Sequence, residues 1–138
     1  MFENIMKKDK ILNIWKKRQM KESLNEHEKL MIKVMEAHSE YHDFFNKKNI
    51  YEILNDWGGE DPFFHLILHW VLEEQIKNNN PPEVSVAFNH LMQKSRDGHR
   101  VMHSLGIVLA DELNEMLKSN GKFNDERYRE RIAGFMEI

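Results

Sequence analysis

The sequence predicts an all-α protein: a helical bundle of four main helices plus short helical segments, in a single all-helical domain over residues 1–138. Three observations lead to this fold class. Apolar residues recur at the three- and four-residue spacing of amphipathic helices, and no stretch of useful length alternates with period two as a half-buried strand does. Helix start and stop signals separate the periodic segments. A length of 138 residues suits one domain that can bury a core.

Capping residues locate the individual helices. Asn25 with Glu28 three positions later resembles a capping box, and Asn124 can cap the last helix. Ser39 marks a break, followed by a short helical continuation to about residue 46 and a loop with one helical turn over residues 47–60. The expected helices span about residues 2–20, 26–38, 62–77, 82–94, 98–118 and 125–136.

The helix expected after Asp61 is the most apolar segment of the chain. Asp61 can accept a backbone N–H as the N-cap, and Pro62 suits the first helical position. The helix stays apolar almost all the way round, which predicts burial. His65, His69 and Glu73 follow one another at four-residue intervals, so they share one face of this buried helix.

Composition excludes several classes of protein. With 41% hydrophobic and 31% charged residues the chain reads as soluble and globular, and its net charge of -3 argues against nucleic-acid binding. The absence of cysteine excludes disulfides, thiolate zinc sites and iron–sulfur clusters. No apolar run reaches membrane-spanning length and no signal peptide is recognisable, so we expect a cytoplasmic protein.

The charge is unevenly distributed along the chain. Residues 1–21 carry seven basic and two acidic residues, whereas the rest carries 13 basic and 21 acidic residues. This basic segment is interpreted as a solvated helix face or, alternatively, as a weak contact surface for a partner such as nucleic acid or anionic lipid. The sequence identifies no other partner.

The eight histidines are the most informative feature of the composition. A random arrangement would give about half a His-x-x-x-His pair, whereas three pairs occur on three separate helical segments. Helical bundles build metal sites in this way, with ligands projected inward from facing helices. His27 and His90 fall outside the pairs and are expected to be core histidines that are hydrogen-bonded to a carbonyl or a carboxylate. The pairs are His38/His42, His65/His69 and His99/His103.

These residues form the candidate metal site, with Glu73 as a further ligand or bridge. Imidazole is a good ligand for zinc, iron, copper and nickel. Six histidines exceed the needs of one tetrahedral zinc, which favours a non-haem iron pair or one octahedral ion with additional histidines around it. Other carboxylates that could ligate the ion or accept from an imidazole N–H are Glu40, Glu74 and Glu112.

Other readings of the histidines remain open. The zinc-protease motif requires Glu directly after the first histidine, and Ser39, Leu66 and Arg100 stand there instead, which excludes it. The histidines could form a metal-free hydrogen-bond network that fixes packing or senses pH. They could also line a small-molecule pocket without metal.

At these residues the chain resembles a bacterial family, domain-of-unknown-function family 1841. The family shows His-Pro-Glu-Tyr-His, then Asn-Pro-Phe-Leu-His-Leu-x-x-His-Leu with Glu-Gln a turn later, then Gln-Pro-Pro-Gly, and a histidine element ending in Leu-Gly. The departures here are Ser39 for proline, Asp61 for asparagine and Glu83 for glycine. The matching stretches are His38 to His42, Asp61 to Leu66 with His69 and Glu74-Gln75, Asn80-Pro81-Pro82, and His99 to Leu105-Gly106.

The resemblance covers nearly the whole chain and implies one fold and a genuine site, but no particular reaction. From the residues we therefore expect a helical bundle that binds one or two transition-metal ions, iron or zinc, for small-ligand binding or metal-assisted chemistry. The alternative is a metal-free binding or adaptor module whose basic N-terminal helix contacts a partner. The sequence does not decide whether the protein is an enzyme.

Overall fold

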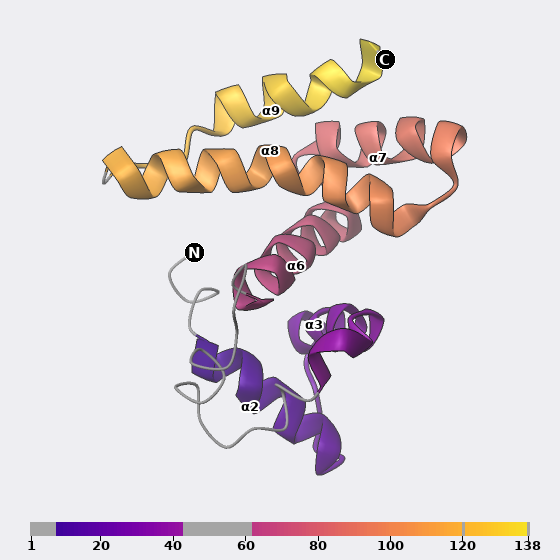
Figure 1. Ribbon diagram of the computed structural model, residues 1–138, viewed down its shortest axis with the longest axis vertical. Helices are drawn as coiled ribbons and strands as arrows, with labels where there is room; N and C mark the ends of the chain where they lie inside the picture. Colours follow the sequence, from indigo (N-terminus) through magenta and orange to yellow (C-terminus); the bar gives the residue numbers. More distant parts are fainter. Residues whose placement is uncertain (1–7, 43–61, 120, 138) are drawn as a thin grey trace. The chain divides into compact units, whose positions relative to one another are not determined.

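A computed structural model describes residues 8–42, 62–119 and 121–137 of the chain. These residues form six α-helices, two short 3₁₀ helices and no strand, so the predicted all-α class is confirmed (Figure 1). The chain divides into two compact units, Met1–Trp70 and Val71–Ile138, and helix α6 contributes residues to both. The single domain expected from the sequence stays a prediction.

The six helices lie where the sequence predicts them. The N-terminal unit contains α2 (Lys8–Gln19), α3 (Glu26–Ala37), η1 (Ser39–Tyr41) and the first half of α6 (Pro62–Asn78). The C-terminal unit contains the rest of α6, α7 (Pro82–Ser95), α8 (Gly98–Ser119), α9 (Asp125–Ala133) and η2 (Gly134–Glu137). The predicted helix start at residue 2, the Asp61 cap and the loop over residues 47–60 lie outside the described residues.

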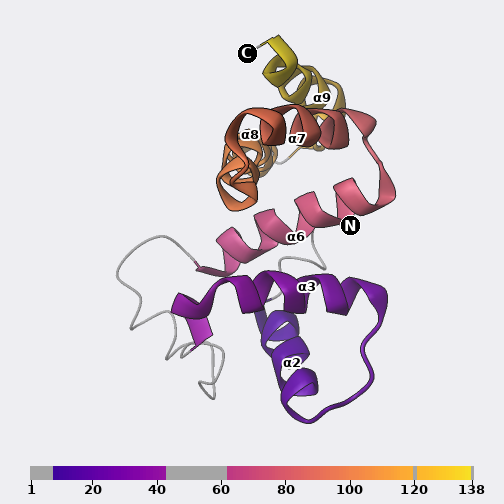
Figure 2. The same cartoon turned by 90° about the vertical axis from the view of Figure 1, so that its right-hand side faces the viewer.

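In the N-terminal unit, α2 packs against α3 through one apolar face on each helix (Figure 2). The predicted capping box is confirmed: Asn25 Oδ1 accepts from the Glu28 N–H at 2.8 Å, and Glu28 Oε1 accepts from the Asn25 N–H at 3.0 Å. This box stops α3 from fraying at its start, because it satisfies two backbone donors that have no partner within the helix. The buried residues of the two helices include Ile11, Ile14, Trp15, Met31, Val34 and Met35.

Two ion pairs and one hydrogen bond hold the same unit together. Lys17 Nζ lies 2.8 Å from Glu28 Oε2, and Arg18 Nε lies 2.9 Å from Glu36 Oε1, so two basic residues of the N-terminal segment are paired with α3 carboxylates. On the other side of α3, the Trp70 indole N–H donates to the backbone carbonyl of His27 at 2.9 Å and ties α6 to α3.

The predicted burial of α6 is confirmed on nearly every side of the helix. Its buried residues are Phe63, Leu66, Ile67, Leu68, His69, Trp70, Val71 and Leu72. Such a helix brings its polar residues into an apolar environment of low dielectric constant, where hydrogen bonds and charge interactions are stronger than in water.

In the C-terminal unit, α7, α8 and α9 contact one another (Figures 1 and 2). Pro82 opens α7 as predicted, and Arg96, with φ at 60°, ends it in the left-handed region before Gly98 starts α8. Tyr128 of α9 is fully buried and its hydroxyl donates to Gln75 Oε1 at 2.7 Å. Gly106 is buried, and a Cβ there would lie 3.8 Å from Leu72.

A buried carboxylate links α8 to α9. Glu112 is only 2% exposed, yet Arg127 Nε reaches its two oxygens at 2.7 and 2.9 Å and Arg131 Nη1 reaches it at 3.1 Å. Two guanidinium groups compensate a charge that would be costly to bury alone. Among the described helices, none combines the length and apolarity that a membrane span requires.

Candidate metal centre

The candidate site begins where α3 ends. His38 leaves the helical region with φ at -114° and ψ at 63°, and its backbone N–H donates to Met35 O at 3.1 Å. The last carbonyls of a helix have no partner within it. Here two imidazoles supply donors: His38 Nδ1 lies 2.7 Å from Val34 O, and His42 Nε2 lies 2.9 Å from Met35 O.

This arrangement selects the tautomer of His38. A carbonyl oxygen can only accept, so the hydrogen of a neutral His38 ring is on Nδ1 and the lone pair is on Nε2. His38 is 1% exposed, which keeps this geometry away from water. A backbone carbonyl that holds one ring nitrogen is the usual means by which proteins aim the other nitrogen at a metal.

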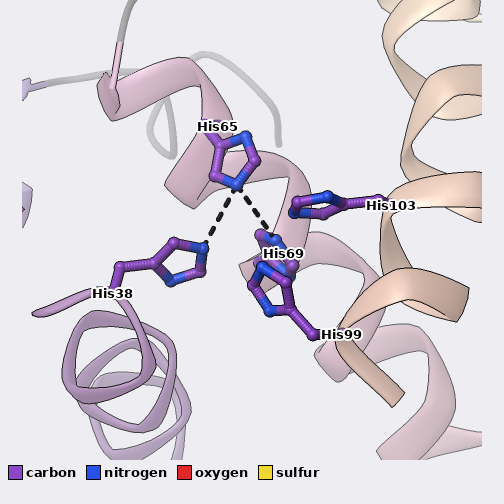
Figure 3. A group of neighbouring side chains, drawn as sticks. All are labelled: His38, His65, His69, His99 and His103. Atoms are coloured by element: carbon purple, nitrogen blue, oxygen red, sulfur yellow. Dashed lines mark hydrogen bonds between the residues drawn. The ribbon is translucent and has the colours of Figure 1, made fainter. Parts of the chain in front are cut away.

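Helix α6 supplies the two partners of that nitrogen. His65 and His69 lie one turn apart on the same face, as the sequence predicts, because four residues at about 100° each return a side chain nearly to its starting direction. His65 Nε2 lies 3.2 Å from His38 Nε2 and 3.2 Å from His69 Nε2. In Figure 3 the nitrogen-bearing edges of these three rings point toward one another.

The distances fit three ligands of one ion. Nitrogens about 2.1 Å from the same metal lie about 3.0 Å apart at a right angle and about 3.4 Å apart at a tetrahedral angle. The observed 3.2 Å falls between these values. The ring centroids are 4.7 to 5.0 Å apart and the planes are inclined by 58° to 77°, so the rings surround a common point rather than stack. Three histidines in this geometry could hold a metal ion.

Hydrogen bonding alone does not account for the same contacts. With the His38 hydrogen on Nδ1, a bond between His38 and His65 requires the hydrogen on His65 Nε2. That nitrogen then has no in-plane lone pair to accept from His69. With neutral rings, at most one of the two 3.2 Å contacts is therefore a full N–H···N hydrogen bond. A cation at the centre would instead attract all three lone pairs.

Two predicted ligands are placed elsewhere. His42 donates from Nε2 to the carbonyl of Met35, and its ring lies 5.1 Å from Trp15 at an inclination of 44°, so it supports the end of α3 instead of joining the three rings. Glu73, one turn beyond His69, is half-buried and is not part of the three-histidine cluster.

The third predicted pair belongs to α8. His99 and His103 are exposed, and their ring centroids are 4.2 Å apart, which confirms that the two residues share one face of that helix (Figure 3). Of the additional carboxylates, Glu112 is held by two arginines, whereas Glu40 is exposed and Glu74 is half-buried.

Tyr41 lies next to the site, although the sequence predicted no role for it there. The ring of Tyr41 lies parallel to His38, at an interplanar angle of 4° with centroids 5.6 Å apart. It also meets His65 edge-on at 6.1 Å. Its position between His38 and His42 in the chain was the available signal, because a short turn that carries two histidines also places the residues between them near the site.

Comparison with known proteins yields one match. The family model described as "Domain of unknown function (DUF1841)" matches residues 6–133. No curated protein and no solved structure matches the chain.

Proposed function

The chain belongs to the family described as a domain of unknown function, DUF1841, and we propose from the geometry of its own histidines that it binds a transition-metal ion. The ligands are Nε2 of His38, His65 and His69. The observation that supports this most directly is the pair of 3.2 Å nitrogen–nitrogen contacts, which match ligands of one ion and exceed what neutral rings can satisfy by hydrogen bonds.

Zinc and non-haem iron are the ions that we propose for this donor set. Imidazole nitrogens bind both well, and the described cluster contains no soft thiolate to favour copper(I). Catalytic zinc sites use three protein ligands and keep a further position for water. The same vacancy would allow this protein to bind a small ligand or to activate water for metal-assisted hydrolysis.

His99 and His103 extend the proposal. Two imidazoles four residues apart on a helix can grip one ion, and their centroid distance of 4.2 Å suits such chelation. We propose them as further ligands of the same ion or of a second one. This part of the proposal depends on their spacing along α8, and metal stoichiometry in a His99→Ala, His103→Ala double variant tests it.

Elemental analysis of protein purified without a histidine tag tests the main proposal. The wild type should carry about one equivalent of zinc or iron, and His65→Phe, which keeps a ring but removes both nitrogens, should carry less than about a tenth of that. His27→Ala is the matched control, because this exposed side chain lies outside the cluster and its carbonyl, which Trp70 uses, is retained.

A wild type with little metal, and no difference from His65→Phe after incubation with zinc or iron(II), would refute metal binding. The metal-free alternative, an adaptor that contacts a partner through residues 1–21, would then be preferred. In that segment Lys17 and Arg18 already pair with Glu28 and Glu36, which reduces the charge offered to a partner. The cytoplasmic location stays a prediction.

A further inference from the structure

We propose that His42 is a positioning residue that holds the ligand His38 in place, and is not itself a ligand. This inference rests on the proposed metal site, whose geometry it explains. His42 follows His38 at the same four-residue spacing as His69 follows His65, yet the two pairs have different roles in the structure.

The difference arises because α3 ends just before the first pair. α3 stops at Ala37 and the chain continues as the short 3₁₀ helix Ser39–Tyr41, so His38 and His42 do not share a helix face. The turn brings His42 back toward α3, where its Nε2–H donates to Met35 O at 2.9 Å. This nitrogen is committed to the backbone, which leaves only Nδ1 for a metal, and His42 is not in the group of described residues whose ligand atoms lie together at the site.

Contacts on both sides confine His42. Its ring lies 5.1 Å from the buried ring of Trp15 in α2, while its hydrogen bond reaches α3. The turn before His42 is thereby anchored at its far end. At its near end, the Tyr41 N–H donates to His38 O at 2.9 Å.

The anchored turn presents Tyr41 to the site. Tyr41 covers the face of the His38 ring at an interplanar angle of 4°, and it meets the edge of His65 at 6.1 Å. Offset parallel and edge-on arrangements are the favourable geometries for aromatic pairs. His42 thus fixes the turn, the turn fixes Tyr41, and Tyr41 limits the rotation of His38 about the Val34 hydrogen bond.

Two substitutions separate positioning from ligation. His42→Leu removes the N–H donor, whereas His42→Gln keeps a donor that can reach the same carbonyl. Co²⁺ is the probe, because its visible absorption reports the ligand set, and Zn²⁺ affinity is measured by competition with a chelating dye. His65→Phe serves as the ligand-loss reference, and His27→Leu serves as the control for removal of a histidine outside the cluster.

We expect His42→Leu to bind Zn²⁺ about tenfold more weakly with unchanged Co²⁺ band positions, since residues that orient ligands typically change affinity by about 10- to 100-fold. His42→Gln should recover affinity to within about threefold of the wild type. Altered Co²⁺ bands in His42→Leu would show that His42 is a ligand and would overturn the proposal. Unchanged affinity in His42→Leu, or no recovery in His42→Gln, would overturn it equally.

A metal-free measurement keeps this inference separate from the metal proposal. Long-range ¹H–¹⁵N correlation spectra should show the Nδ1–H tautomer for His38 and the Nε2–H tautomer for His42 in the wild type. His42→Leu should give a mixture of tautomers at His38. If the wild type binds no Zn²⁺ or Co²⁺ but His38 responds in this way, the metal proposal fails and the positioning role stands; a single, unchanged His38 tautomer refutes the positioning role.

Discussion

Removal of the central imidazole should affect stability very differently with and without metal. His65→Phe deletes the nitrogen that lies 3.2 Å from both other rings. In the metal-free wild type, only one of these two contacts can be a full hydrogen bond, which contributes about 1 kcal/mol. The other contact is either a weak share of the same hydrogen or two lone pairs that face each other, so it adds little stability. We therefore expect the metal-free variant to match the wild type within about 1 kcal/mol.

Metal should separate the two proteins. An ion at a hundred times its dissociation constant stabilises a one-site protein by about 2.7 kcal/mol. For a chain of 138 residues this corresponds to an increase of about 10 °C in Tm. The variant lacks the central ligand and should gain little, so the wild type should melt well above it only when metal is present.

Thermal melting followed by circular dichroism measures the stability difference without metal, in EDTA, and the stabilisation by metal, in excess Zn²⁺. His65→Leu provides a second variant in case phenylalanine fits poorly, and His27→Ala should follow the wild type in both conditions. The reasoning would be refuted if His65→Phe and His65→Leu each lost about 2 to 3 kcal/mol in EDTA while Zn²⁺ left the wild type unchanged. Such a result would identify the three rings as a structural hydrogen-bond network.

Two further predictions concern residues outside the cluster. Glu112→Gln should destabilise the fold by about 2 to 3 kcal/mol in urea unfolding, independently of metal, because it removes the buried carboxylate that Arg127 and Arg131 share. This lies below the usual cost of breaking a buried pair, because the two arginines are 47% and 38% exposed and Arg131 keeps its ion pair with Asp111. A loss below about 0.5 kcal/mol would contradict this. The hydrogen bond from the Asn25 N–H is the main cause that lowers the pKa of Glu28 from its usual 4.5, and the hydrogen bond from Lys17 is the second. The charged form of Glu28 therefore stabilises the fold above pH 4.5, and this contribution is lost as pH falls through the lowered pKa. Glu28→Gln, which can keep the capping box, should therefore be less stable than wild type at pH 7, and the difference should shrink as pH falls below 4.5, whereas a pH-independent difference would contradict the assignment.

Local signals predicted the helices and half of the site. Asn25 with Glu28 predicted the start of α3, and Pro82 predicted the start of α7, because caps and proline act within a few residues. His65 and His69 were predicted to share a face because both lie well inside one helix, where the four-residue spacing has a definite geometric meaning.

The roles of His38 and His42 could not be predicted in the same way. Their spacing has that meaning only if the helix continues, and α3 stops at Ala37. Which of the two imidazoles would face α6 depends on the backbone geometry of one residue at the helix end. Glu112 likewise read as a candidate ligand, because the arginines that hold it are 15 and 19 residues away in the sequence and only the packing of α9 brings them there.

Val34 holds His38 through its main-chain oxygen and not through its side chain. The orientation of the His38 ring therefore depends on the number of residues between these two positions more than on which residue stands at position 34. Any residue of similar volume at position 34 offers the same oxygen, so replacement there should leave the donor direction intact. A single amino acid inserted within α3 would instead turn everything after it by about 100° and carry the His38 ring away from its α6 partners. Gaps and insertions, more than substitutions, would then be the changes that this part of the chain tolerates least.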